Sequence, residues 1–171
     1  MTELRIWTVR HTIRVAALPK RVFELVANIE RWPALFDSLE SVEHVGFDGV
    51  CERVRFRKRV DGVTHSWISV RELNPKRLQV RFRQVDVPSP LASMGGLWLV
   101  VPKGIGSVIA LDHYYRVADD LSVTAARVER EIAARSTSML TALRRTAEFD
   151  GGVAELIESY SDRITEGESL P

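Results

Sequence analysis

The sequence has little of what several protein classes require. Its 171 residues include one cysteine, Cys51, so no disulfide can form within the chain, and we expect a cytoplasmic protein. The first ten residues carry charges and lack the apolar run of a signal peptide. No segment approaches the roughly 20 apolar residues that span a bilayer. The sequence therefore predicts neither export nor a membrane partner.

Strong charge and metal-binding patterns are also missing. The formal net charge is +1, which gives no overall field to attract nucleic acid. Four histidines, His11, His44, His65 and His113, lie in separate segments without the spacing of metal ligands. There is no glycine-rich phosphate loop and no nucleophile elbow. We therefore expect no metal, no cofactor and no nucleic-acid partner.

Alternating apolar and polar residues dominate the middle of the chain. Residues 11–17 predict a first strand, Pro19 suits the first turn of a helix, and residues 34–38 predict a second short helix. From about residue 42 to 117 the pattern has period two and is interrupted by Asp-Gly, Asn-Pro and Lys-Gly pairs. This region predicts five or six strands joined by hairpins, hence an antiparallel sheet.

The last third of the chain has helical periodicity. Residues 122–148 predict a long amphipathic helix, and Asp150-Gly151-Gly152 predicts a break before a further helix at 153–164 and a polar tail. One long helix can cover the concave face of a curved sheet, and strong curvature leaves a cavity between them. We therefore predict one α+β domain over residues 1–171, with its core at about 11–148 and six to seven strands wrapped around the long helix.

Two predicted strands carry an unusual mixture of side chains on one face. Side chains two residues apart on a strand point the same way. The two faces are formed by Trp67, Ser69 and Arg71 and by Met94, Gly96 and Trp98. Because an interior arginine must be paired or solvated, this mixture favours a ligand cavity over a purely structural core.

Five short segments carry a resemblance to a known family. They are residues 29–36 (IERWPALF), 66–71 (SWISVR), 81–84 (RFRQ), 92–98 (ASMGGLW) and 111–113 (LDH). In this order and spacing they resemble the polyketide aromatase/cyclases of the START-like, helix-grip superfamily, over roughly residues 11–148. The resemblance implies a helix-grip fold and a role in bacterial aromatic polyketide biosynthesis. There, a poly-β-ketone on an acyl carrier protein would fold in the cavity, undergo aldol closure and lose water without a cofactor.

The resemblance implies two catalytic residues, Arg71 and His113, and Ser69 is a third candidate from its place beside Arg71 on the same strand face; each has a plainer explanation. Arg71 would stabilise an enolate or alkoxide, or it would simply pair with a carboxylate such as Glu52 or Asp86. His113 would move protons near its ordinary pKa of about 6.5, or be a satisfied core histidine. Ser69 would donate to a substrate carbonyl or orient a water molecule, or it would simply bond to nearby backbone. The sequence leaves these alternatives open.

A larger set of residues is expected to bind substrate. It consists of Trp32, Phe36, Trp67, Phe82, Gln84, Met94, Gly96, Trp98, Tyr115, Ser136 and Met139. Two of them depart from the family pattern, because some relatives have a helix aspartate at the position of Met139 and a second arginine at that of Gln84. Tyr114 stands where the family has an acidic or aromatic neighbour of the histidine. The same residues can also be ordinary core.

Expected partners are the acyl carrier protein and the components of a minimal polyketide synthase, with the chain a monomer or a homodimer. The alternating arginines Arg53, Arg55, Arg57 and Arg59, with Arg81 and Arg83, predict a solvated sheet surface or a docking site for an acidic carrier protein. Two other functions stay open. One is a non-catalytic carrier or sensor of hydrophobic aromatic ligands, and the other is a structural partner that associates through the last helix.

Overall fold

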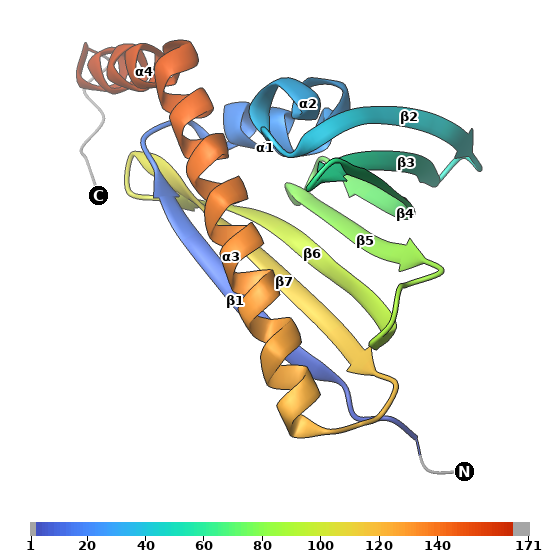
Figure 1. The fold of residues 1–171 in the computed structure, drawn as a ribbon. Coiled ribbons are helices and arrows are strands. Elements are labelled where there is room, and N and C mark those ends of the chain that lie inside the picture. Colours follow the sequence, from blue (N-terminus) through green and yellow to red (C-terminus); the bar gives the residue numbers. More distant parts are fainter. Residues whose placement is uncertain (1–2, 166–171) are drawn as a thin grey trace.

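Seven strands form one antiparallel sheet with helices on one face (Figure 1). The structure is a computed structural model that describes residues 3–165, except for the side chains of residues 150, 151, 164 and 165. The predicted polar tail at 166–171 lies outside the described residues. The strands are β1 (Trp7–Val15), β2 (Leu39–Phe47), β3 (Cys51–Val60), β4 (Val63–Asn74), β5 (Gln79–Val85), β6 (Leu91–Lys103) and β7 (Gly106–Val117). Their order in the sheet is β1-β7-β6-β5-β4-β3-β2.

The predicted antiparallel sheet of six to seven strands is confirmed. Its hairpin turns fall where the sequence places them, with Gly49 at φ 93° and Gly62 at φ 76°, a backbone region that favours glycine. The first strand begins earlier than expected, at Trp7, because its first residues pair with Tyr115 and its neighbours on β7.

The helices also follow the sequence, with two shifts. They are α1 (Pro19–Ala27), the 3₁₀ turn η1 (Ile29–Arg31), α2 (Trp32–Leu35), α3 (Ser122–Ala147), the π-helical turn η2 (Glu148–Gly152) and α4 (Val153–Thr165). The short helix predicted at 34–38 begins instead at Trp32, with Pro33 in its first turn, where a missing N–H costs nothing. The predicted break at 150–152 is a π-helical turn that leads directly into α4.

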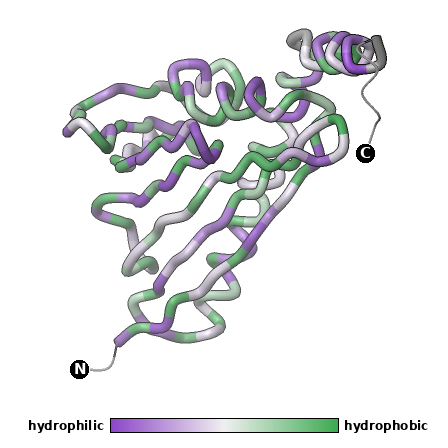
Figure 2. The backbone as a smooth tube through the Cα atoms, turned by 180° about the vertical axis from the view of Figure 1, so that it is seen from behind, coloured by the Kyte–Doolittle hydropathy of each residue, from purple (hydrophilic) through white to green (hydrophobic). Residues whose placement is uncertain are grey.

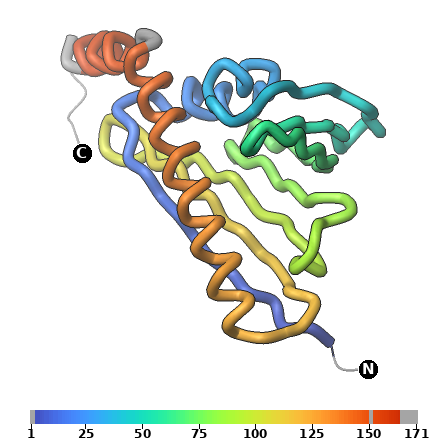
Figure 3. Tube along the Cα trace, viewed as in Figure 1, coloured from blue at the N-terminus to red at the C-terminus, as the bar shows by residue number. Residues whose placement is uncertain are grey.

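The long helix α3 crosses one side of the sheet over β1 and β7, and strands β2–β5 curl away from it (Figures 1 and 3). Apolar and hydrophilic residues are interleaved along the strands (Figure 2), so each strand has an inner and an outer face. A large apolar cluster joins α1, α2, α3 and the sheet, and a smaller one lies under the first turns of α3. Within residues 3–165, no helix is long and apolar enough to cross a membrane.

Candidate active site

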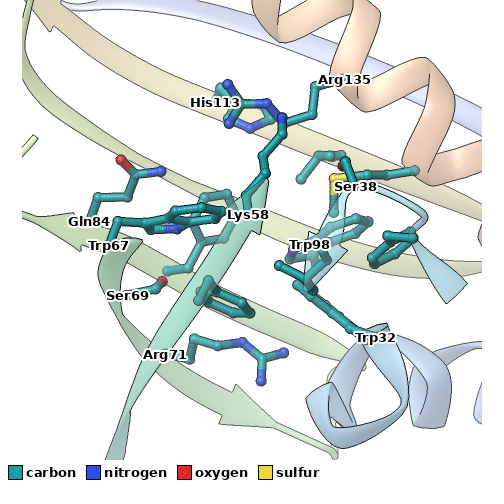
Figure 4. A pocket seen from close by; sticks show the side chains of 16 residues that line it. Trp32, Ser38, Lys58, Trp67, Ser69, Arg71, Gln84, Trp98, His113 and Arg135 are labelled. Atoms are coloured by element: carbon teal, nitrogen blue, oxygen red, sulfur yellow. The ribbon is translucent and has the colours of Figure 1, made fainter. Parts of the chain in front are cut away.

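A cavity of about 120 Å³ lies between the sheet, α2 and α3 (Figure 4). It is lined by Trp32, Phe36, Ser38, Leu39, Phe56, Lys58, Trp67, Ser69, Arg71, Phe82, Gln84, Trp98, Leu111, His113, Arg135 and Met139. Burial distinguishes a floor from a mouth. Ser69, Arg71 and Trp98 are buried, whereas Ser38 and Arg135 are exposed. The predicted interior cavity is therefore present and opens to solvent at the end that carries Arg135.

The cavity wall is built from aromatic rings in contact with one another. Trp32 stacks on Phe56 with ring centroids 5.7 Å apart, and Phe56 stacks on Trp67 at 5.4 Å. Trp32 also meets the edges of Phe36 at 5.3 Å and Trp98 at 6.0 Å. Contacts of this kind hold each ring in one orientation. The result is a rigid apolar wall made from α2, β3, β4 and β6.

Arg71 lies at the cavity floor and is held from several sides. Its Nη1 donates to Glu52 Oε1 at 2.5 Å and to the Ala27 carbonyl at 3.2 Å, and its Nη2 donates to the Val26 carbonyl at 2.7 Å. The guanidinium carbon lies 5.2 Å from the centre of the Trp32 ring. Glu52 reaches it because the two residues are direct neighbours across the β3–β4 ladder. Arg71 is thus fixed in place by one carboxylate and the end of α1.

This pairing decides part of what Arg71 can do. Burial lowers the pKa of Arg71 and Glu52 partly offsets that effect, but an arginine stays protonated at any relevant pH. Its bonds within the described residues use three of its five N–H groups. The expected pairing with Glu52 is present, yet the residue is 1% exposed and lines the cavity, so it is not a surface ion pair.

His113 lies on β7 beside the Phe82 ring, with centroids 5.7 Å apart in an edge-on arrangement. Burial lowers its pKa to about 4, and the nearby charges of Arg135 and His11 contribute. Among the described residues, its buried Nδ1 has no hydrogen-bond partner. His113 is therefore a neutral imidazole at pH 7, rather than one balanced near its ordinary pKa.

Most predicted site residues converge on the cavity. All three expected catalytic residues line it, as do seven of the expected binding residues: Trp32, Phe36, Trp67, Phe82, Gln84, Trp98 and Met139. Their roles in catalysis and binding stay predictions. Met94, Gly96, Tyr115 and Ser136 do not line it.

These four residues have structural surroundings instead. Met94 and Tyr115 belong to the smaller apolar cluster, where the Tyr115 hydroxyl donates to the Ala125 carbonyl at 3.0 Å. Both lie beyond the cavity because β6 and β7 extend past its end. Ser136 is buried on α3, one position along the helix from the exposed Arg135.

Gly96 makes room for a neighbouring ring rather than for a ligand. A Cβ there would lie 2.5 Å from Cζ of Phe82, its direct partner on β5, and 2.0 Å from the Asp112 carbonyl oxygen. The missing side chain lets the Phe82 ring cross Gly96 and reach His113.

Six lining residues were not predicted from sequence: Ser38, Leu39, Phe56, Lys58, Leu111 and Arg135. Period two along β3 and β7 places Phe56, Lys58 and Leu111 on inner faces, and Arg135 lies one helical turn before Met139. The spacing in the sequence therefore allows these four residues to be predicted. Ser38 and Leu39 follow α2, where no periodicity indicates direction.

A family model described as "Polyketide cyclase / dehydrase and lipid transport" matches residues 7–148. The chain belongs to this family. The resemblance inferred from the five segments is thereby confirmed. Family members similar to the chain include the "Granaticin polyketide synthase bifunctional cyclase/dehydratase" of Streptomyces violaceoruber, 39% identical over 90% of this chain and 48% of the relative. The corresponding actinorhodin protein of Streptomyces coelicolor is 35% identical over 90% and 48%. The chain spans about half the length of these relatives.

Solved structures agree with the fold. The di-domain ARO/CYC BexL superposes with a TM-score of 0.75 at 32% identity, covering 83% of this chain and 46% of that one. The Zhui aromatase/cyclase from a Streptomyces species gives a TM-score of 0.71 at 24% identity, over 87% of this chain and all of that one. At 24% identity, this second match shows a shared fold alone. The predicted helix-grip fold is confirmed.

Proposed function

We propose that this domain is an aromatase/cyclase that folds a carrier-bound linear poly-β-ketone in its cavity and catalyses regiospecific aldol cyclisation and dehydration. Relatives that share 35–39% of its residues are named cyclase/dehydratases. The observation that carries the proposal is Arg71, a permanently charged donor that is fixed at the floor of an aromatic cavity. No cofactor is required for this chemistry.

The proposed reaction begins at an acidic CH₂ between two carbonyl groups. Its C–H bond breaks, the proton passes to the unprotonated imidazole of His113, and the enolate carbon attacks a second ketone to form the C–C bond. Arg71 stabilises the negative oxygen with its free N–H groups. Since a pKa of about 4 makes His113 a weak base, proton transfer depends on that stabilisation of the enolate. The alkoxide then takes up the proton that His113 holds. The resulting hydroxyl leaves as water together with the remaining proton of the former CH₂, and enolisation of the ring ketones makes the ring aromatic.

The aromatic wall would select one folded shape of the chain. Rigid walls bring the reacting carbons together and exclude other contacts, which supplies proximity. The enclosed space of about 120 Å³ is smaller than the roughly 300–1,000 Å³ typical of pockets for drug-sized ligands. A polyketone must therefore displace a lining side chain at the mouth, such as Lys58, or extend through the mouth.

The experiment is reconstitution with a minimal polyketide synthase and product analysis by mass spectrometry. Adding the protein should shift the products toward one correctly cyclised ring. Arg71→Lys keeps the charge but loses the planar fork, so it should lose most of this effect while thermal unfolding shows a folded protein. Arg14→Lys, at an exposed position of β1 away from the cavity, is the matched control and should behave as wild type. An unchanged product spectrum with the wild-type protein would overturn the proposal.

A second candidate function is binding of a hydrophobic aromatic ligand without turnover. Met139 favours it, because this part of the α3 wall is apolar and offers no acid for proton transfer. The same reconstitution separates the two functions. Tight binding of a finished polycycle, together with no effect on the linear chain, would support the carrier function.

We further propose that the outer sheet face docks an acidic carrier protein. Arg53 and Arg83 are both exposed and flank Val70 in one row across β3, β4 and β5. Two outward arginines in one row form a local positive patch despite the low net charge. Arg55, by contrast, is bonded to Glu43 at 3.1 Å, so it contributes less charge to such a surface.

A further inference from the structure

Two cations meet at the mouth of the cavity. Lys58 lies on β3 and points inward because it follows Val54 and Phe56 with period two. Arg135 reaches the same place from α3, one turn before Met139. In Figure 4 the two side chains extend toward one another beside His113.

Neither cation is neutralised by an ion pair. In residues 3–165, the ion pairs found do not include Lys58 or Arg135. Glu131, one turn earlier on α3, is the acidic group that acts on Arg135. Burial lowers the pKa of Lys58, and the charge of Arg135 lowers it further. At the cavity floor, by contrast, Arg71 forms an ion pair with Glu52.

Two adjacent positive charges repel one another, and the half-buried Lys58 has also lost part of its hydration, so an anion that joins them lowers the free energy. We propose that Lys58 and Arg135 form an anion-binding subsite at the cavity mouth, which binds an anionic oxygen group of the ligand. Two parts of a ligand have this chemistry: the phosphate diester of a carrier's pantetheine arm, and a carboxylate or enolate of the chain itself. The identity of the ligand rests on the proposed function, whereas the subsite rests on the geometry.

Calorimetry with two matched pairs of probes tests the subsite. The first pair is an S-hexyl pantetheine with and without its 4′-phosphate. The second is a naphthalene carboxylate and its methyl ester. Wild-type protein should bind the charged member of at least one pair about tenfold more tightly, as expected for one charge-assisted hydrogen bond. The pair that shows the preference identifies the source of the anion.

Variants locate the effect. Lys58→Met and Arg135→Met should each remove most of the preference without weakening binding of the neutral probe. Arg57→Met is the matched control, since Arg57 is adjacent on β3, exposed and of equal charge; it should keep the preference. Equal binding of both members of both pairs by wild type overturns the proposal. So does an equal loss of preference in Arg57→Met.

These outcomes are independent of the cyclase assay. A protein that redirects polyketide products but shows no anion preference would refute the subsite alone. A protein that prefers the anionic probes but leaves the products unchanged would refute the proposed function and keep the subsite.

Discussion

His113 should remain unprotonated at pH values where an exposed histidine is charged. Burial is the main cause of its lowered pKa of about 4, Arg135 and His11 add to it, and Asp112 opposes them. In the unfolded chain the same side chain has an ordinary pKa of about 6.5. Between these values the unfolded chain binds a proton that the folded chain does not. The free energy of unfolding must therefore fall as the pH falls through this range.

The size of this effect follows from the two pKa values. The interval from about 6.5 to about 4 corresponds to at most about 3 kcal/mol. The contribution is complete above pH 6.5, declines as the pH falls, and is gone at about pH 4. By pH 4.5 about 2 kcal/mol should be lost relative to pH 7.

Urea denaturation at pH 7 and pH 4.5 measures the loss. Wild type should lose about 2 kcal/mol more than His113→Gln, because the variant lacks the titrating ring but keeps the other histidines and carboxylates. An NMR titration of the His113 ring gives its pKa directly. A ring that titrates near 6.5, or equal losses in both proteins, would refute the lowered pKa of His113 and the stability argument built on it.

Two further predictions concern charge. Glu52→Gln removes the carboxylate that pairs with the buried Arg71 cation, so the free energy of unfolding in urea should fall by about 3 kcal/mol. Adding Arg71→Met removes the unpaired charge and should recover part of the loss. If the free-energy changes of the two substitutions simply add in the double variant, the two residues do not form a direct pair. Arg53→Glu with Arg83→Glu should weaken binding of the acyl carrier protein at low salt far more than at high salt. Unchanged affinity in surface plasmon resonance would dismiss this docking surface.

The inner faces of the sheet could be predicted from the sequence because period two depends only on local geometry. Trp67, Ser69 and Arg71 therefore line the cavity as expected. The same logic fails at the ends of long strands. β6 is 13 residues long, so Met94 shares a face with Trp98 yet lies beyond the cavity, in the smaller cluster. Alternation gives the direction of a side chain but not how far along the strand a cavity extends.

Contacts between distant elements were harder to predict. Glu52 was one of two carboxylates considered for Arg71, and only the β3–β4 register makes it the direct neighbour. The carbonyls of Val26 and Ala27 gave no sequence signal at all, since every residue has one. The role of Gly96 also depends on register, which places the Phe82 ring across it.

The charge distribution explains why an arginine in the cavity does not by itself define the chemistry. Arg71 at the floor is compensated by Glu52, so it offers directed hydrogen bonds more than a net positive field. Lys58 and Arg135 at the mouth have no such partner among the described residues, so the net positive field originates there. His113 stays neutral because burial lowers its pKa and the nearby charge of Arg135 lowers it further. A ligand with one anionic end and neutral ketones would therefore bind with the anion at the mouth and its ketones toward Arg71. The arrangement of charges, rather than the arginine alone, would set the direction in which a chain enters.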